Sequence, residues 1–146
     1  IQANNLGKED ATLLLQYINA VRQSVYAAKA IKDIQHNLKD FEASANDILH
    51  QQCTILRNEW FIFDDMLNQL LNSSNKENIT VDIEHSTKEA LLQEENQKSE
   101  IMAQLKNNQL NEVEASTLMN VYREMLSCKK SLLMALTNLE AETIKK

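Results

Sequence analysis

The chain has no proline and a single glycine, Gly7, among its 146 residues. At average usage a chain of this length would carry roughly seven prolines and ten glycines. Sheets, tight turns and phosphate-binding loops depend on these residues for kinks and for positive φ angles. Their scarcity therefore argues strongly against Rossmann-like, barrel, sandwich and P-loop domains. It also means that no glycine-rich phosphate-binding loop can be written from this sequence. The chain is predicted to be all-helical.

The sequence also lacks clustered positive charge and long apolar runs. Its formal charge is −6, from 15 basic and 21 acidic residues that are interleaved along the chain. Nucleic acids and anionic lipids bind clustered Lys and Arg, so neither is an expected partner. No run of about 18 apolar residues occurs, so we expect no membrane-spanning helix in this part of the protein.

Only two cysteines are present, Cys53 and Cys128, and they lack the spacing of a zinc site. Two buried thiols in a reducing compartment are favoured, and a disulfide between them stays open. Hydrophobic residues make up 43% of the chain, enough for one buried core. Because the sequence begins at Ile1 without a signal peptide, we interpret residues 1–146 as a single helical domain cut from a longer protein.

Apolar residues recur at three- and four-residue steps in four segments, the pattern of helices that each bury one face. Polar stretches at Ser44–Asp47, Asn72–Asn78 and Asn107–Asn111 separate the segments. Ser44 or Asn46 can cap the second helix, and the third helix is predicted from about Thr80, with a capping-like start, to Lys106. We therefore expect an antiparallel up-down-up-down four-helix bundle about 40–50 Å long.

The spacing predicts which side chains these helices bury. In the first helix the stripe comprises Leu14, Ile18, Val21, Val25, Ala28, Ile31, Ile34, Leu38, Phe41 and Ala45. In the second it comprises Leu49, Cys53, Leu56, Trp60, Phe63, Leu67 and Leu70. In the fourth it comprises Leu118, Val121, Met125, Cys128, Leu132, Ala135 and Leu139.

Two D-x-x-H motifs, Asp33–His36 and Asp82–His85, invite comparison with the di-metal sites that some four-helix bundles hold between E-x-x-H helices. The predicted register places these motifs about 20 Å apart along the bundle axis at 1.5 Å per residue. We therefore predict no shared metal site and no cofactor. His50 has no positioned nucleophile beside it, and Cys128 has no helix N-terminus to acidify it. The chain is not expected to be an enzyme.

A polar level crosses the predicted bundle about halfway along the third helix. Glu94 or Glu95, and then Lys98, fall at core-facing positions, and the other helices also become polar at that height. One interpretation is a peripheral third helix with solvated charges. The other is a polar layer that fixes register or faces a partner. The candidate residues are Asp33, Asn37, Arg57, Lys98, Asn120, Arg123 and Glu124.

Two segments carry a family resemblance. Residues 28–38, AKAIKDIQHNL, followed by Phe41–Ser44, resemble the recurring helix of PhoU-like proteins. Residues 114–127, EASTLMNVYREMLS, resemble the last helix of the PhoU-like C-terminal region of bacterial Na⁺/phosphate cotransporter-family proteins. Together the segments cover about 30 residues. The resemblance implies a PhoU-like bundle on the cytoplasmic side of the inner membrane, attached to transmembrane segments, that regulates phosphate transport.

The implied partners are the transmembrane part of the same chain or other transport and regulatory proteins, and a homodimer is also open. PhoU proteins bind metal clusters through E/D-x-x-x-D motifs, but Lys29 stands at the first acidic position before Asp33, and Asn120-x-x-x-Glu124 is likewise incomplete. Metal binding is therefore not carried over. The competing hypothesis is a four-helix ligand-binding sensor domain of a membrane receptor.

Overall fold

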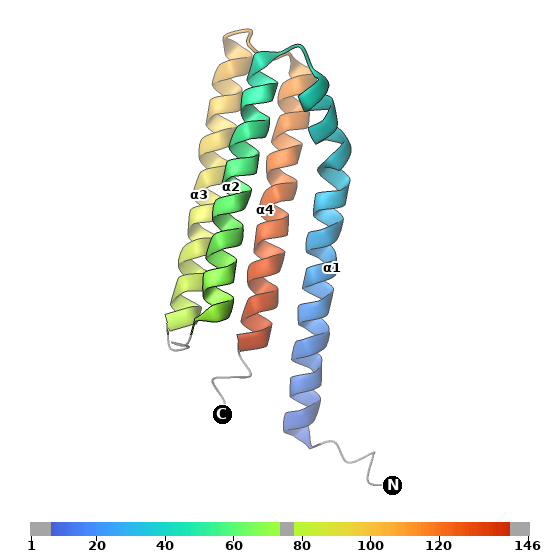
Figure 1. The fold of residues 1–146 in the computed structure, drawn as a ribbon, viewed down its shortest axis with the longest axis vertical. Coiled ribbons are helices and arrows are strands. Elements are labelled where there is room, and N and C mark those ends of the chain that lie inside the picture. Colours follow the sequence, from blue (N-terminus) through green and yellow to red (C-terminus); the bar gives the residue numbers. More distant parts are fainter. Residues whose placement is uncertain (1–6, 74–77, 141–146) are drawn as a thin grey trace.

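A computed structural model describes residues 7–73 and 78–140, and these residues form four helices and no strand. The helices are α1 (Lys8–Ala43), α2 (Asp47–Asn72), α3 (Ile79–Lys106) and α4 (Glu112–Glu140). They alternate in direction, up, down, up and down (Figure 1). The predicted all-α four-helix bundle is confirmed. No helix in the described ranges combines the length and apolarity needed to cross a bilayer.

The turn between α1 and α2 lies where the polar stretch predicts it. Asn46 is the N-cap of α2, and its side-chain oxygen accepts a hydrogen bond from the Ile48 backbone N–H at 2.9 Å. The Asn46 amide also donates to the Gln109 carbonyl at 3.0 Å and to Glu114 Oε2 at 2.7 Å. One side chain therefore caps α2 and ties its start to the neighbouring turn between α3 and α4.

The turn between α3 and α4 contains no glycine. Asn108 has a φ of 56°, and asparagine tolerates this left-handed conformation better than most residues. Asn111 then caps α4: its side-chain oxygen accepts from the Glu114 N–H at 2.8 Å, and its amide donates to Glu114 Oε1 at 2.6 Å. The reciprocal pair satisfies free donors at the helix start.

The predicted capping of α3 by Thr80 is wrong. Thr80 lies inside the first turn of α3, and Asn78 occupies the N-cap position without a side-chain cap hydrogen bond. The described part of the predicted 72–78 loop is Asn72, which ends α2, with Ser73 and Asn78, while residues 74–77 lie outside the described residues.

The core changes composition along the bundle. Around the turns at 44–46 and 107–111, all four helices contribute buried residues, including Ile34, Leu56, Ile101 and Leu118. Toward the other end the apolar cluster comes from α2, α3 and α4 only: Phe63, Leu70, Ile79, Ile83, Leu133 and Leu136. There α1 joins through small residues, with Ala27 and Ala30 against Cys128. Small side chains let two helices approach closely, and α1 packs mainly on α4.

The buried stripe of α1 differs from the prediction in the first half of the helix. Leu14, Ile18, Val21 and Val25 are 46–64% exposed, and the side that meets the bundle carries Ala20, Ala27 and Ala30 instead. The prediction holds for Ile34 and Phe41, which are buried, whereas Ala45 is exposed in the turn. At the N-terminal end α1, with 36 residues, extends past the other helices (Figure 1).

The stripes of α2 and α4 agree better with the structure. Trp60 and Leu67 are half-buried, and the other predicted residues of α2 are buried. In α4 the stripe drifts: Leu132 is half-buried and Leu139 is 39% exposed, while Leu133 and Leu136 take the core positions. A straight helix has 3.6 residues per turn, so a strict seven-residue stripe rotates away from a fixed neighbour.

Candidate functional site

Four of the seven predicted polar residues line one open cavity of about 750 Å³ beside α4, between α1 and α3. Asn37 comes from α1, Lys98 from α3, and Asn120 and Arg123 from α4. The helices place them together because α1 and α3 both lie against α4. The remaining lining residues are Met102, Leu105, Glu112, Ala115, Ser116, Thr117 and Met119.

The two cations of this cavity have different surroundings. Lys98 Nζ lies 2.9 Å from Glu94 Oε1 and 4.0 Å from Glu95 Oε1, and the hydrogen bond that Lys98 donates to Glu94 raises the pKa of Lys98. Arg123 donates a hydrogen bond from Nη2 to the neutral Asn120 side-chain oxygen. Among the described residues no carboxylate lies within ion-pair distance of Arg123. The cavity therefore presents an exposed guanidinium whose charge is not already paired.

The other three predicted residues do not line this cavity. Arg57 pairs with Glu42 across α2 and α1 at 2.8 Å, beside a different cavity. Asp33 is exposed on α1, and Glu124 is half-buried on α4. The seven polar residues were predicted to lie at one level along the bundle axis. They lie on different faces of the bundle, because each helix directs its polar side differently.

A second polar group lies inside the bundle, and the sequence did not indicate most of it. Lys129 is only 6% exposed. Its Nζ donates to Gln93 Oε1 at 3.3 Å and lies 5.7 Å from the centre of the Phe63 ring. Gln97 Nε2 donates to Glu59 Oε1 at 3.4 Å. This polar cluster, consisting of the buried Lys129 and the half-buried Glu59, Gln93 and Gln97, joins α2, α3 and α4.

Burial shifts the pKa of both titratable groups in the cluster. It raises the pKa of Glu59, and the charge of Lys129 opposes that rise. It lowers the pKa of Lys129, and the charge of Glu59 opposes that fall. Desolvation dominates in both groups because the bundle interior disfavours either charge more than their mutual attraction favours it. Both residues also line a cavity of about 370 Å³ between α2 and α3, so the cluster can be reached from the surface.

Signals for the polar cluster were present in the sequence. Lys129 stands four residues after Met125 and four before Leu133, so it continues the buried stripe of α4 at helical spacing. The core-facing position predicted for Glu94 or Glu95 is taken by Glu94, which is 7% exposed. The hydrogen bond from Tyr122 Oη to Gln52 Oε1, at 2.5 Å between two buried side chains, had no such signal.

The remaining reactive side chains include two buried thiols and two paired imidazoles. Both cysteines are free and buried, and burial raises the pKa of the Cys128 thiol to about 11. His36 pairs with Asp40 and His85 with Glu89, in each case at 3.2 Å on an exposed helix surface. Within the described ranges no three His, Cys, Asp or Glu side chains converge as metal ligands. The features that remain for function are helix surfaces and the cavities between them.

No protein-family model, curated protein or solved structure matches this chain.

Proposed function

We propose that this chain is a non-enzymatic regulatory and interaction domain of a sodium-dependent phosphate transporter, located on the cytoplasmic side of the inner membrane. Its partner would be the transmembrane part of the transporter or an associated regulatory protein. The proposal rests on the resemblance of residues 28–44 and 114–127 to PhoU-like segments. It places the regulatory contact at a helix-lined cavity rather than at a loop.

One observation carries the proposal. The two segments with the resemblance lie on α1 and α4, which pack against each other. Three of their polar residues, Asn37, Asn120 and Arg123, line the same cavity, and Lys98 of α3 completes it. Residues that are far apart in the sequence thus form one polar surface. A surface of this kind is suited to recognise one partner segment.

The chemistry of the cavity indicates what that segment would offer. Arg123 presents a planar guanidinium, which binds carboxylates through two parallel hydrogen bonds. Asn37 and Asn120 offer amide donors and acceptors, and Met102, Leu105 and Met119 supply apolar contact. An acidic segment or the C-terminal end of a partner helix satisfies these groups best.

The substitution Arg123→Leu tests this contact. Because Arg123 is exposed, its loss should leave the fold intact, with an unchanged helical circular dichroism spectrum. It should change sodium-dependent uptake of radiolabelled phosphate by at least about threefold, because a charge-assisted hydrogen bond contributes about 1 kcal/mol or more. Uptake is measured in cells that carry the whole gene.

Arg57→Leu is the matched control, since Arg57 pairs with Glu42 on another side of the bundle. Uptake that responds equally to both substitutions, or to neither, would contradict a role for the cavity. Unfolding of the Arg123→Leu variant would show that Arg123 supports the fold instead of a partner contact.

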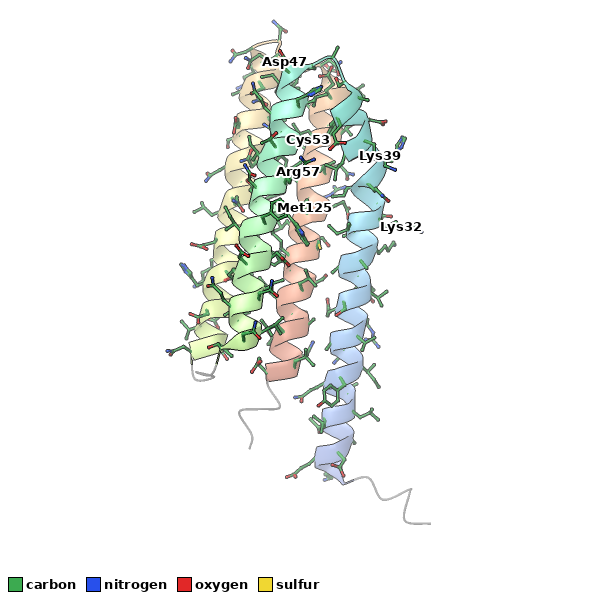
Figure 2. The ribbon with its side chains drawn as sticks, in the orientation of Figure 1. Lys32, Lys39, Asp47, Cys53, Arg57 and Met125 are labelled. Carbon is green, nitrogen blue, oxygen red and sulfur yellow. The ribbon has the colours of Figure 1, made fainter. Side chains whose placement is uncertain are left out.

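The sensor-domain alternative has one observation in its favour. An apolar cavity of about 280 Å³ lies between α1 and α2, lined by residues that include Ile34, Leu38 and Trp60. Cys53 and Arg57 of α2 and Met125 of α4 also line it (Figure 2). If a small apolar ligand acts here, Leu38→Phe should block its effect, whereas Arg123→Leu should not.

A further inference from the structure

Helix α1 carries two apolar faces on opposite sides. One face meets the bundle through Ala20 and Ala27, which are 5% and 3% exposed. The second, here called the outer face, consists of Leu14, Ile18, Val21, Val25 and Ala28. Its centre lies about 160° around the helix from the centre of the five buried residues of α1, at 100° per residue; these are Ala20, Ala27, Ala30, Ile34 and Phe41. A helix with apolar residues on both sides is typical of one that is covered on both sides.

The structure shows where the outer face is directed. Its four larger side chains are 46–64% exposed. Lys32 follows Ala28 by four residues, and Lys39 follows Lys32 by seven, so both continue the same line along α1. Their side chains project away from the other helices (Figure 2). The outer face therefore points away from α4.

The spacing of the outer face is that of a coiled-coil seam. Its residues follow one another by four, three, four and three positions, so that Ile18 and Val25 occupy a positions and Leu14 and Val21 occupy d positions. Residues 11–28 contain one charged residue, Arg22, although 25% of the whole chain is charged. Solvated helix faces carry charge, so this composition indicates a face covered by another helix.

We propose that the outer face pairs with the same face of a second copy of this chain, forming a parallel two-stranded coiled coil. The flanking residues select this partner and this direction. A parallel pair places Tyr17 beside Arg22 of the second copy and Ser24 beside Lys29, so no like charges meet. An antiparallel pair centred on Val21 would bring the two Arg22 side chains together. Among parallel coiled coils, β-branched residues at a positions favour two strands.

A membrane surface fits the outer face less well. Helices that lie on lipid carry Lys and Arg along a polar face opposite the apolar one. On α1 the opposite face is occupied by α4, and residues 11–28 offer only Arg22. The pairing is independent of the proposed function, because the cavity with Arg123 takes its α1 residue, Asn37, from beyond the outer face.

Sedimentation equilibrium of the chain and of an Ile18→Glu, Val25→Glu double variant tests the pairing. The wild-type chain should be dimeric at about 100 μM. The double variant should be monomeric, with its dimer Kd weakened at least about 100-fold, because a dimer would bury four carboxylates. The matched control is Ile62→Glu with Val81→Glu, at residues 70% and 62% exposed on α2 and α3. This control should remain dimeric.

A cysteine at position 14 tests the direction and does not depend on the folding of the Glu variant. Cys53 and Cys128 are buried, so Leu14→Cys adds the one reactive thiol of the described residues and should cross-link two copies at matching positions. Glu84→Cys, exposed on α3, should not. A monomeric wild-type chain, or a dimer that survives in the Ile18→Glu, Val25→Glu variant, would overturn the proposal. So would a Leu14→Cys chain that cross-links only to an added Ala28→Cys chain and not to itself. So would a monomer that binds phosphatidylglycerol vesicles through this face.

Discussion

At the residue scale, the buried pair of titratable groups is the least ordinary feature of the molecule. Glu59 and Lys129 lie in an interior formed by α2, α3 and α4, and burial shifts the pKa of each toward its neutral form. Gln97 Oε1 is buried without a hydrogen-bond donor among the described residues. Because the amide of the same side chain already contacts Glu59, a proton on Glu59 would supply a donor beside that oxygen.

The raised pKa of Glu59 predicts how stability depends on pH. The folded state binds a proton on Glu59 more tightly than the unfolded state does. This contribution to stability is therefore fully present below the unfolded pKa near 4.5 and is lost as pH rises through the folded pKa. Relative to Glu59→Gln, the wild-type chain should lose stability as pH rises from 4 toward neutrality, as measured by urea unfolding at a series of pH values.

The comparison between the two chains isolates the titration of Glu59, since every other carboxylate is common to both. Burial lowers the pKa of Lys129, and this residue too is common to both chains. If the wild-type chain instead gains stability over Glu59→Gln as pH rises, Glu59 and Lys129 form a net stabilising ion pair, and desolvation does not dominate.

At the element scale, the ends of the helices depend on asparagine because proline is absent and glycine is nearly so. Asn46 caps α2 and bonds to Gln109 and Glu114 of the neighbouring turn. Its substitution by Ala should lower the free energy of unfolding by about 1–2 kcal/mol, because the cap and both ties are lost. Chemical denaturation measures the loss.

Asn58→Ala is the control for this prediction. Asn58 is exposed in the middle of α2, where Ala is the better helix former, so the substitution should be neutral or slightly stabilising. Equal effects of the two substitutions would mean that the cap of Asn46 contributes nothing beyond helix propensity.

The elements also show how far the sequence predicts this fold. Helix number, direction and turns follow from the apolar spacing and from the Asn- and Ser-rich breaks. Periodicity alone did not identify which face of α1 meets the bundle, because large residues such as Val21 lie on the exposed face and small ones such as Ala27 on the buried face. The predicted stripe follows size, whereas close packing on α4 selects small side chains.

The candidate site was predictable to a similar degree. Asn37, Lys98, Asn120 and Arg123 share a height in the bundle, and they line one cavity. Arg57 shares the height but pairs with Glu42 on another side, because helix rotation cannot be read from height. The burial of Lys129 was not predicted, because a lysine in a helix is usually solvated. In the structure its ammonium lies over the Phe63 ring.

At the scale of the whole molecule, the two proposed contacts use different sides of α1. One side, with α3 and α4, forms the cavity of Asn37, Lys98 and Arg123. The opposite side, toward the N-terminal end, carries the outer face of Leu14 to Ala28. The chain is acidic overall, with a formal charge of −6, and Lys98 is paired with Glu94. The guanidinium of Arg123 is therefore the group of this cavity that suits an acidic partner segment. A dimer through the outer face of α1 would leave the cavity with Arg123 open in each copy.

The most direct test of the central claim is sodium-dependent uptake of radiolabelled phosphate in cells of the source organism. The cells carry either the intact gene or the same gene without the codons for residues 1–146. If the chain regulates a phosphate transporter, its removal should change the uptake rate at least about twofold, or abolish the dependence of uptake on phosphate supply. Sodium-dependent uptake that is the same with and without the domain, at low and high phosphate, would contradict the claim.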